Sequence, residues 1–215
     1  IVSSKETTVG ELLTKLDYKI NEGDVVEPAV TTRIQQDDFR INIYRAVPVA
    51  IVDTDGTLAC LDHRLPCIQE EPKDYDGFFG RVRFDTPFPS ITGPVAMLTF
   101  MGYTVIIVSG RPTSTGYDTN EWLLNFGVLF EYLFMRNAGD YKPDHKVKEE
   151  ILQMMFKAGL REDAIKIVID DRDSVCDGVW RKHDLPLVQV DRGAAIQIHP
   201  GAMKLAVEIG IPVKF

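Results

Sequence analysis

Reactive side chains gather at three points of the sequence, each directly after a run of apolar residues. In chain order they are Asp53-Thr-Asp-Gly-Thr57, Ser109-Gly-Arg111 and Asp170-Asp-Arg172. A single aspartate at the end of a strand usually caps the next helix or forms a turn. Caps do not require paired acids in two separate places, so the pattern indicates one site that combines carboxylates, a hydroxyl group and a guanidinium group.

The acidic residues of this pattern favour a bound cation. Asp53, Asp55, Asp170 and Asp171 would repel one another if they met without a positive charge between them. Carboxylate oxygens in small number, completed by water and a phosphate, are ligands that suit Mg²⁺. The sequence therefore predicts a magnesium site.

The apolar runs before these residues predict the strands that position them. Residues 48–52 are short and continuously apolar, as in a strand buried on both faces of a parallel sheet. Residues 104–108 and 165–169 are mainly apolar and predict two further strands of this kind. We expect further strands and helices at 129–135 (a weaker strand), 187–190 (the last strand), 90–101, 144–158 and 173–183 (helices). This alternation predicts an α/β fold, a three-layer Rossmann-like domain with an open, mainly parallel sheet and helices on both faces. Its strand ends would meet at one edge, where such sheets bind ligands.

Two segments fall outside this alternation. Residues 1–45 form an expected N-terminal extension, with a helix that starts after Thr8 and an edge strand near residues 39–44. Residues 46–215 form the expected main domain. Within it, residues 58–89 are rich in proline, glycine and charge and too long for an ordinary connection, which predicts a lid.

Composition narrows the partners and the compartment. The formal charge of −8 argues against binding along a duplex, which requires many basic residues, but not against binding one terminal phosphate. No apolar run approaches the ~20 residues that span a bilayer, so no membrane is expected. Three cysteines without a CxxC pair favour incidental thiols over zinc or redox chemistry. With no signal peptide visible, we expect the cytoplasm, or a host's cytoplasm should the chain be phage-encoded.

The motifs resemble those of the haloacid-dehalogenase-like (HAD) phosphatases, with Lys148 as a further motif on the helix 144–158. Within that superfamily, residues 48–191 are most similar to the 3′-phosphatase domain of phage polynucleotide kinase–phosphatases. The shared features are Asp53-Thr-Asp-Gly-Thr-Leu-Ala59, Arg64, Met101-Gly-Tyr103, Val108-Ser-Gly-Arg111, Asp144, Val147-Lys-Glu-Glu-Ile151, and Ile169-Asp-Asp-Arg172 with Trp180. Residues 65–89 are longer than expected for that domain. The chain contains no Gly-x-x-x-x-Gly-Lys-Ser/Thr loop, so no kinase activity is expected from it.

The resemblance implies a role for each residue. Asp53 would be the nucleophile that forms an aspartyl-phosphate, and Asp55 the general acid and base. Ser109 and Lys148 would stabilise the phosphoryl group, with Lys142 and Lys146 as nearby rivals of Lys148. The implied substrate-binding residues are Arg64, Arg111, Thr57, Gly110 and Asp144. The implied Mg²⁺ ligands are Asp53, the backbone carbonyl of Asp55, Asp170 and Asp171.

The substrate follows less directly from the motifs. The favoured reading is removal of a 3′-phosphate from a nucleic-acid end or a 3′-nucleotide. A phosphatase of 5′-nucleotides or other small metabolites is the enzymatic alternative, and the acidic composition suits it. A binding or assembly protein with a relict site is disfavoured, because every motif position holds the reactive residue type. The sequence leaves four questions open: whether the substrate is DNA, RNA or a mononucleotide, whether the chain forms a homo-oligomer, what residues 1–45 do, and whether a further domain lies upstream of Ile1.

Overall fold

The computed structural model describes residues 6–21, 23–34 and 39–214 of the chain. The chain divides into two compact units, Ile1–Val47 and Pro48–Phe215.

The first unit contains one helix and a two-stranded sheet among its described residues. Helix α1 (Val9–Lys15) begins after Thr8, as predicted, in a reciprocal capping arrangement. The Thr8 hydroxyl accepts from the amide of Glu11 at 3.3 Å, and the Glu11 carboxylate accepts from the amide of Thr8 at 3.1 Å. Strands β1 (Val25–Glu27) and β2 (Asn42–Tyr44) pair antiparallel.

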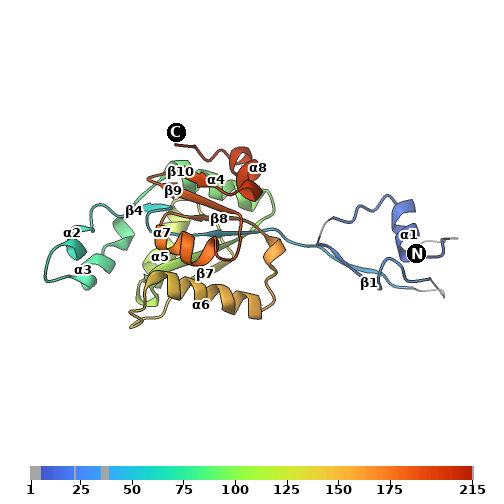
Figure 1. Ribbon diagram of the computed structural model, residues 1–215, viewed down its shortest axis with the longest axis horizontal. Helices are drawn as coiled ribbons and strands as arrows, with labels where there is room; N and C mark the ends of the chain where they lie inside the picture. The colour runs from blue at the N-terminus through green and yellow to red at the C-terminus, as the bar shows by residue number, and fades with distance from the viewer. Residues whose placement is uncertain (1–5, 22, 35–38, 215) are drawn as a thin grey trace. The chain divides into compact units, whose positions relative to one another are not determined.

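A six-stranded sheet forms the centre of the second unit (Figure 1). In spatial order its strands are β10 (Ala194–Ile198), β9 (Leu187–Asp191), β8 (Ile165–Asp170), β3 (Val49–Val52), β6 (Thr104–Pro112) and β7 (Tyr132–Arg136). All neighbours pair in parallel except β10 with β9. Every residue of the central strand β3 is buried, which explains its continuously apolar sequence. The predicted α/β fold with a mainly parallel sheet is confirmed.

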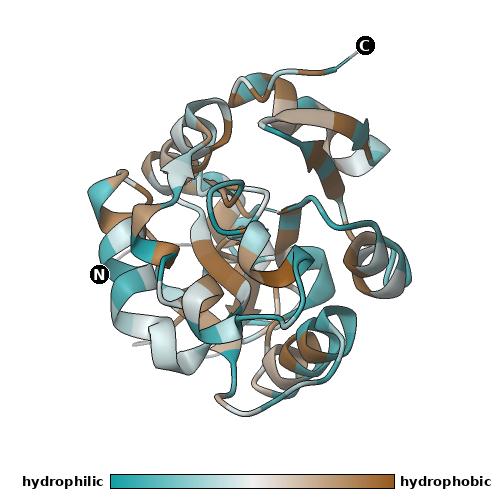
Figure 2. Ribbon diagram, turned by 90° about the vertical axis from the view of Figure 1, so that its left-hand side faces the viewer, coloured by the Kyte–Doolittle hydropathy of each residue, from teal (hydrophilic) through white to brown (hydrophobic). Residues whose placement is uncertain are grey.

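Alternate residues of β3 face two hydrophobic cores. Ala50 and Val52 belong to the core under α4 (Pro89–Phe100), α5 (Gly116–Asn125) and α8 (Pro200–Glu208). Val49 and Ile51 belong to the core under α6 (Asp144–Lys157), α7 (Asp173–Val175) and the π-helical turn η4 (Cys176–Trp180). Figure 2 shows the apolar strands in the middle, surrounded by helices with hydrophilic outer segments. The result is the three-layer arrangement that such periodicity predicts.

The segment expected to form a lid is a helical insertion, which we define as residues 59–87. Its ends pair as a short antiparallel ribbon, β4 (Ala59–Cys60) with β5 (Thr86–Pro87). Between them lie α2 (Pro66–Gln69), α3 (Tyr75–Phe79) and the 3₁₀ turn η1 (Val82–Phe84). Helices α2 and α3 stand apart from the sheet in Figure 1. Its function as a lid stays a prediction.

Three sequence expectations about this unit need correction. The strand at 187–190 is not the last, because β10 and α8 follow it. The helix expected over 173–183 is present but ends at Trp180, and it changes from α-helical to π-helical geometry after Val175. The strand expected from residue 129 begins at Tyr132. A short 3₁₀ helix, η2 (Thr113–Thr115), precedes α5, and another, η3 (Glu162–Ala164), precedes β8.

Candidate active site

The parallel register brings the three reactive groups to one edge of the sheet. Val52 of β3 is paired with Ile107 of β6 and with Ile169 of β8. Asp53 therefore follows its strand beside Val108 and Asp170, and its amide donates to the carbonyl of Ile169 at 2.9 Å. Strand β6 continues through the second group to Pro112, with an irregular register between Ser109 and Pro112. Irregularities of this kind re-aim side chains at a sheet edge.

The loop after Asp53 turns sharply at Gly56. Gly56 has a φ of 87°, in the left-handed region that favours glycine. A Cβ atom at this position would lie 2.1 Å from a carboxylate oxygen of Asp171, so a larger residue would strain the backbone and displace the Asp171 side chain. The buried Thr57 hydroxyl donates to the other Asp171 oxygen at 3.3 Å. The turn thus holds the segment Asp53–Thr57 against Asp171.

Three carboxylates converge where the sequence predicts a metal. Oxygens of Asp53, Asp170 and Asp171 lie within 4.8 Å of one another. Burial raises the pKa of Asp53 well above its ordinary value; Lys148 opposes this, and the charges of Asp170 and Asp171 add to it. Burial and the charge of Asp170 raise the pKa of Asp171 to about 6. Hard oxygen donors that repel one another at neutral pH fit a small divalent cation.

Lys148 lies inside this cluster. Its buried ammonium donates to Asp53 at 2.6 Å and to Asp170 at 2.8 Å. Burial would lower the pKa of Lys148, but the charges of Asp170 and Asp53 outweigh it and raise the pKa. The rival Lys146 is exposed, and Lys142 is exposed and paired with Glu150. Of the three lysines, Lys148 is the one that the structure places beside Asp53.

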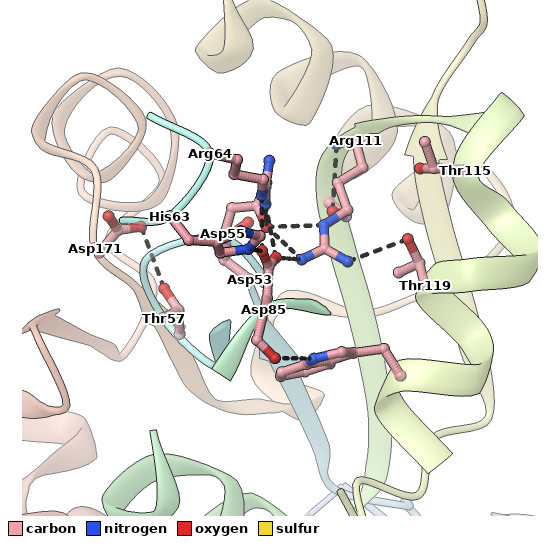
Figure 3. A network of polar contacts seen from close by, with 12 residues as sticks. Asp53, Asp55, Thr57, His63, Arg64, Asp85, Arg111, Thr115, Thr119 and Asp171 are labelled. Carbon is pink, nitrogen blue, oxygen red and sulfur yellow. Dashed lines mark hydrogen bonds and ion pairs between the residues drawn. The ribbon is translucent and has the colours of Figure 1, made fainter. Parts of the chain in front are cut away.

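Asp55 is held by two buried arginines (Figure 3). One of its oxygens accepts from Arg64 at 2.6 Å and from two nitrogens of Arg111, at 2.8 and 2.6 Å. Burial alone would raise the pKa of Asp55, but the charges of Arg111 and Arg64 lower it to about 2. The family resemblance implied that these arginines bind phosphate; in the structure they bind carboxylates, and Arg111 also donates to the Thr119 hydroxyl at 3.3 Å.

Asp85, at the end of the insertion, completes this network and was missed by the sequence analysis. Its buried carboxylate accepts from Arg64 at 2.8 Å through both Nε and Nη2, from Arg111 at 2.6 Å, and lies 2.8 Å from His63 Nε2. Its carbonyl accepts from the indole of Trp122 at 2.7 Å. No motif marked it, because its partners are distant in sequence.

Replacing Asp85 with asparagine should destabilise the fold. The neutral amide leaves two buried guanidinium groups short of a negative charge, a loss that typically costs about 3–5 kcal/mol. Urea unfolding of Asp85→Asn should show this decrease in the free energy of unfolding. The matched control is Asp62→Asn, whose side chain is 52% exposed in its pair with Arg192 and should change stability by less than about 1 kcal/mol. A decrease below ~1 kcal/mol for Asp85→Asn would show that the network is not stabilising.

Gly110 and Asp144 meet at the start of α6. A Cβ atom on Gly110 would lie 2.3 Å from an Asp144 oxygen, so any larger residue here would displace the Asp144 side chain. Asp144 pairs with Arg136 at 3.1 Å and with Arg172 at 3.3 Å. The buried Ser109 hydroxyl accepts from the amide of Arg111 at 3.3 Å. Arg136, at the end of β7, is a second residue that no sequence motif marked.

A pocket of about 740 Å³ opens beside these groups. Asp53, Asp55, Gly110, Asp144 and Arg172 line it, together with residues of the insertion and of the loop between β7 and α6. Its volume lies in the range of about 300–1,000 Å³ that small-molecule sites have. The pocket is therefore large enough for a substrate bigger than inorganic phosphate.

A parallel α/β sheet with an Asp-x-Asp turn, a buried lysine against the first aspartate, and paired acids on a neighbouring strand defines a HAD-superfamily phosphatase. The family model of the polynucleotide kinase PNKP phosphatase domain matches residues 47–194, and the chain belongs to this family. The prediction of a phosphatase is thereby confirmed. Residues 1–31 match a second model, the G5-linked ubiquitin-like domain, over that short segment only.

Solved structures agree with this family. In the structures titled "Structure of the Pnkp1/Rnl/Hen1 RNA repair complex" and "Structure of Pnkp1/Rnl/Hen1 complex", a chain is 25% identical, each with a TM-score of 0.54. The matches cover 74% and 76% of this chain, but only 45% and 50% of those chains. A protein from Clostridium acetobutylicum, described as a predicted phosphatase, shares the fold at 15% identity and a TM-score of 0.51, with 78% and 92% of the two chains covered.

None of the helices formed by the described residues is long and apolar enough to cross a membrane. Cys60, Cys67 and Cys176 are free thiols, and burial together with the nearby Asp170 raises the pKa of Cys176. A raised pKa makes this thiol a poor nucleophile at neutral pH.

Proposed function

We propose that the chain removes a terminal 3′-phosphate from polynucleotide ends or 3′-nucleotides through an aspartyl-phosphate on Asp53. The observation that carries the chemistry is the position of Asp53, which borders a nucleotide-sized pocket and contacts Lys148 at 2.6 Å. Membership of the PNKP phosphatase domain family supports the choice of substrate. Because the matched chains include proteins of an RNA repair complex, RNA ends belong among the substrates to be tested.

The proposed reaction has two displacements. A carboxylate oxygen of Asp53 attacks phosphorus, the bond from phosphorus to the 3′ oxygen breaks, and that oxygen takes a proton from Asp55. Water then attacks the acyl phosphate and gives its proton to the Asp55 carboxylate. The bond between phosphorus and Asp53 breaks, which releases inorganic phosphate and restores both carboxyl groups.

The two arginines would control the proton on Asp55. With a pKa of about 2, Asp55 is ionised at neutral pH and must gain a proton before it can act as an acid. A phosphate dianion beside Asp53 would favour protonation of Asp55, because it adds negative charge and competes for the hydrogen-bond donors of Arg64 and Arg111. Arg64 also has a buried Nη1 without a hydrogen-bond partner among the described residues. A phosphoryl oxygen would satisfy that donor, so substrate binding by both arginines remains part of the proposal.

The other residues would orient and stabilise the reacting groups. Lys148 would hold Asp53 in place and offset negative charge on the phosphoryl group, to which the Ser109 hydroxyl would donate. Thr57 would orient Asp171, which it contacts at 3.3 Å. Gly110 would leave room for the substrate next to Asp144, which Arg136 and Arg172 hold.

A divalent cation fits the convergent carboxylates, and we propose Mg²⁺. Asp53, Asp170 and Asp171 would hold it, with the backbone carbonyl of Asp55. A bound Mg²⁺ would neutralise charge on the phosphoryl oxygens and so allow an anionic nucleophile to approach.

A phosphatase of 5′-nucleotides or other small metabolites is the second candidate, and the charge of the pocket favours it. Six aspartates line the pocket, against three basic residues: Arg136, Lys142 and Arg172. Such a surface offers few partners to a long chain of phosphates. A purely binding role remains disfavoured, because the reactive residues are brought together at one site.

A side-by-side assay separates the two candidates. We expect 3′-phosphorylated DNA and RNA oligonucleotides to be hydrolysed at least ~10-fold faster, as kcat/KM, than their 5′-phosphorylated counterparts, because the chain belongs to the PNKP phosphatase domain family. Phosphate release from 3′- and 5′-mononucleotides and from sugar phosphates completes the comparison. A preference for 5′-mononucleotides or sugar phosphates would overturn the 3′-end proposal and leave the aspartyl-phosphate mechanism standing.

A further inference from the structure

Arg136 fixes the loop between β7 and α6, residues 137–143. Its Nε donates to the carbonyl of Gly110 at 2.9 Å, and its Nη1 donates to the carbonyls of Asp140 and Lys142 at 3.2 and 2.6 Å. Its Nη2 donates to Asp144 at 3.1 Å. One guanidinium group therefore ties this loop to the strand end that carries Ser109 and Arg111.

Tyr141 lies between the two carbonyls that Arg136 binds. Its backbone is held on both sides, yet its side chain is 92% exposed and borders the active-site pocket. A large aromatic ring gains little stability in such a position, because it leaves most of its apolar area in water. A fixed backbone that presents an exposed ring at the pocket that Asp53 also lines is suited to binding a flat ligand.

The insertion supplies further aromatic and aliphatic side chains to the same pocket. Tyr75 and Phe79 of α3 line it, as do Leu65 and Ile68 of the segment around α2. In Figure 1, α2, α3 and the loop before α6 all lie at the same end of the sheet. The pocket thus joins a polar floor at Asp53 and Asp55 to aromatic and aliphatic walls.

The charges of the pocket limit what else could bind the substrate. Beyond the catalytic groups, Asp76, Asp118 and Asp140 offset the basic side chains, so successive phosphates find little attraction. Stacking of a base on an aromatic ring contributes ~1–3 kcal/mol and tolerates any base. Apart from the contacts to the scissile phosphate, the affinity for the substrate would then come chiefly from stacking on an aromatic side chain of the pocket.

We infer that Tyr141 is a stacking platform for the nucleobase of the nucleotide that carries the scissile phosphate. This inference rests on the proposed 3′-phosphatase function. Stacking on Tyr141 would require a base at the terminal nucleotide but would not distinguish one base from another. It would act on the terminal nucleotide alone, so a 3′-mononucleotide and an oligonucleotide would both use it.

The test compares two 3′-phosphorylated oligonucleotides that differ only at the terminal residue, one with a base and one abasic. Wild type, Tyr141→Ala, Tyr141→Phe and Tyr117→Ala are assayed on both. Tyr117 is the matched control, a tyrosine that is 75% exposed on α5 and does not line the pocket. Thermal unfolding checks that each variant is folded.

For Tyr141→Ala we expect KM to rise about 5- to 100-fold on the oligonucleotide with the terminal base, with kcat within about twofold. The abasic oligonucleotide should show no change, Tyr141→Phe should behave as wild type, and Tyr117→Ala should have no effect on either. An equal loss on both oligonucleotides, or none on either, would overturn the inference while wild-type turnover still supports the 3′-phosphatase. A wild type inactive on both would refute the proposed function, and the inference would fail with it.

Discussion

Asp53→Asn is expected to fold normally and to lose phosphatase activity by roughly 10⁴- to 10⁶-fold, the size of effect seen when a catalytic nucleophile is removed. The amide has the shape of the carboxylate but cannot form an acyl phosphate. Activity should be measured as phosphate release from a 3′-phosphorylated oligonucleotide under single-turnover conditions. Under the same conditions, wild type but not the variant should form a phosphorylated protein that acid quenching traps.

The stability of this variant is a second readout. Burial and the charges of Asp170 and Asp171 raise the pKa of Asp53 in the folded state. The folded state then binds the proton of Asp53 more tightly than the unfolded state does. As the pH rises through the pKa that Asp53 has in the folded state, ionisation of this carboxyl group therefore lowers the free energy of unfolding. In buffer without divalent cations, Asp53→Asn should therefore be at least as stable as wild type at pH 7. Thermal unfolding measures this directly.

Asp62→Asn is the matched control for activity. This substitution also replaces an aspartate with asparagine, but at an exposed ion pair with Arg192 that lies outside the pocket lined by Asp53. Its turnover should stay within about twofold of wild type. Substantial turnover by Asp53→Asn, in a preparation shown to be free of wild-type enzyme, would refute the proposed nucleophile.

Removal of divalent cations is expected to lower activity by at least about three orders of magnitude, and added Mg²⁺ should restore it. The reason is the repulsion among Asp53, Asp170 and Asp171, whose oxygens lie within 4.8 Å of one another. Without a cation this charge also repels a phosphate dianion. Ca²⁺ should bind without restoring turnover and should inhibit in competition with Mg²⁺, because its larger and looser coordination disturbs an in-line displacement.

Binding can be followed without activity. Mg²⁺ should raise the thermal unfolding midpoint with concentration, as expected for a ligand that binds only the folded state. Asp171→Asn should shift the Mg²⁺ dependence of both turnover and unfolding midpoint to higher concentrations. The control is Asp177→Asn, whose side chain is 70% exposed and paired with Arg181 on the neighbouring helical turn. Full activity after exhaustive chelation would contradict the metal assignment.

The reactive residues were predictable because their signals are local. Each group lies at the end of a largely apolar run that forms a strand, and a strand covered on both faces, such as β3, is apolar throughout. Parallel strands place their carboxyl ends at one edge, so Asp53, Ser109 and Asp170 could be assigned to one site before any contact was known. Likewise, the choice of Lys148 over its neighbours follows a family pattern, and the structure places Lys148 beside Asp53 at 2.6 Å.

Some elements had weaker local signals and were missed. Strand β10 pairs antiparallel with β9 through a two-residue turn in which Arg192 and Gly193 have φ values of 48° and 85°. Such a turn suits a hairpin, but a lone Arg-Gly pair is a weak signal. The helix expected after Asp171 forms but changes to a π-helical turn over Cys176–Trp180, which no local signal marked; within that turn the Trp180 indole donates to Asp170 at 2.9 Å.

The sequence by itself determined the fold class, the edge of the sheet that carries the site, and the reactive residue types. Only the tertiary structure decided which side chains meet. Asp85 contacts Arg64 and Arg111 across 21 and 26 residues of sequence, and Arg111 contacts Asp55 across 56. Periodicity and motif spacing follow the backbone of one element at a time, whereas these partners come from separate segments that only the tertiary fold brings together. For that reason the arginines could be named from the sequence, but their carboxylate partners could not.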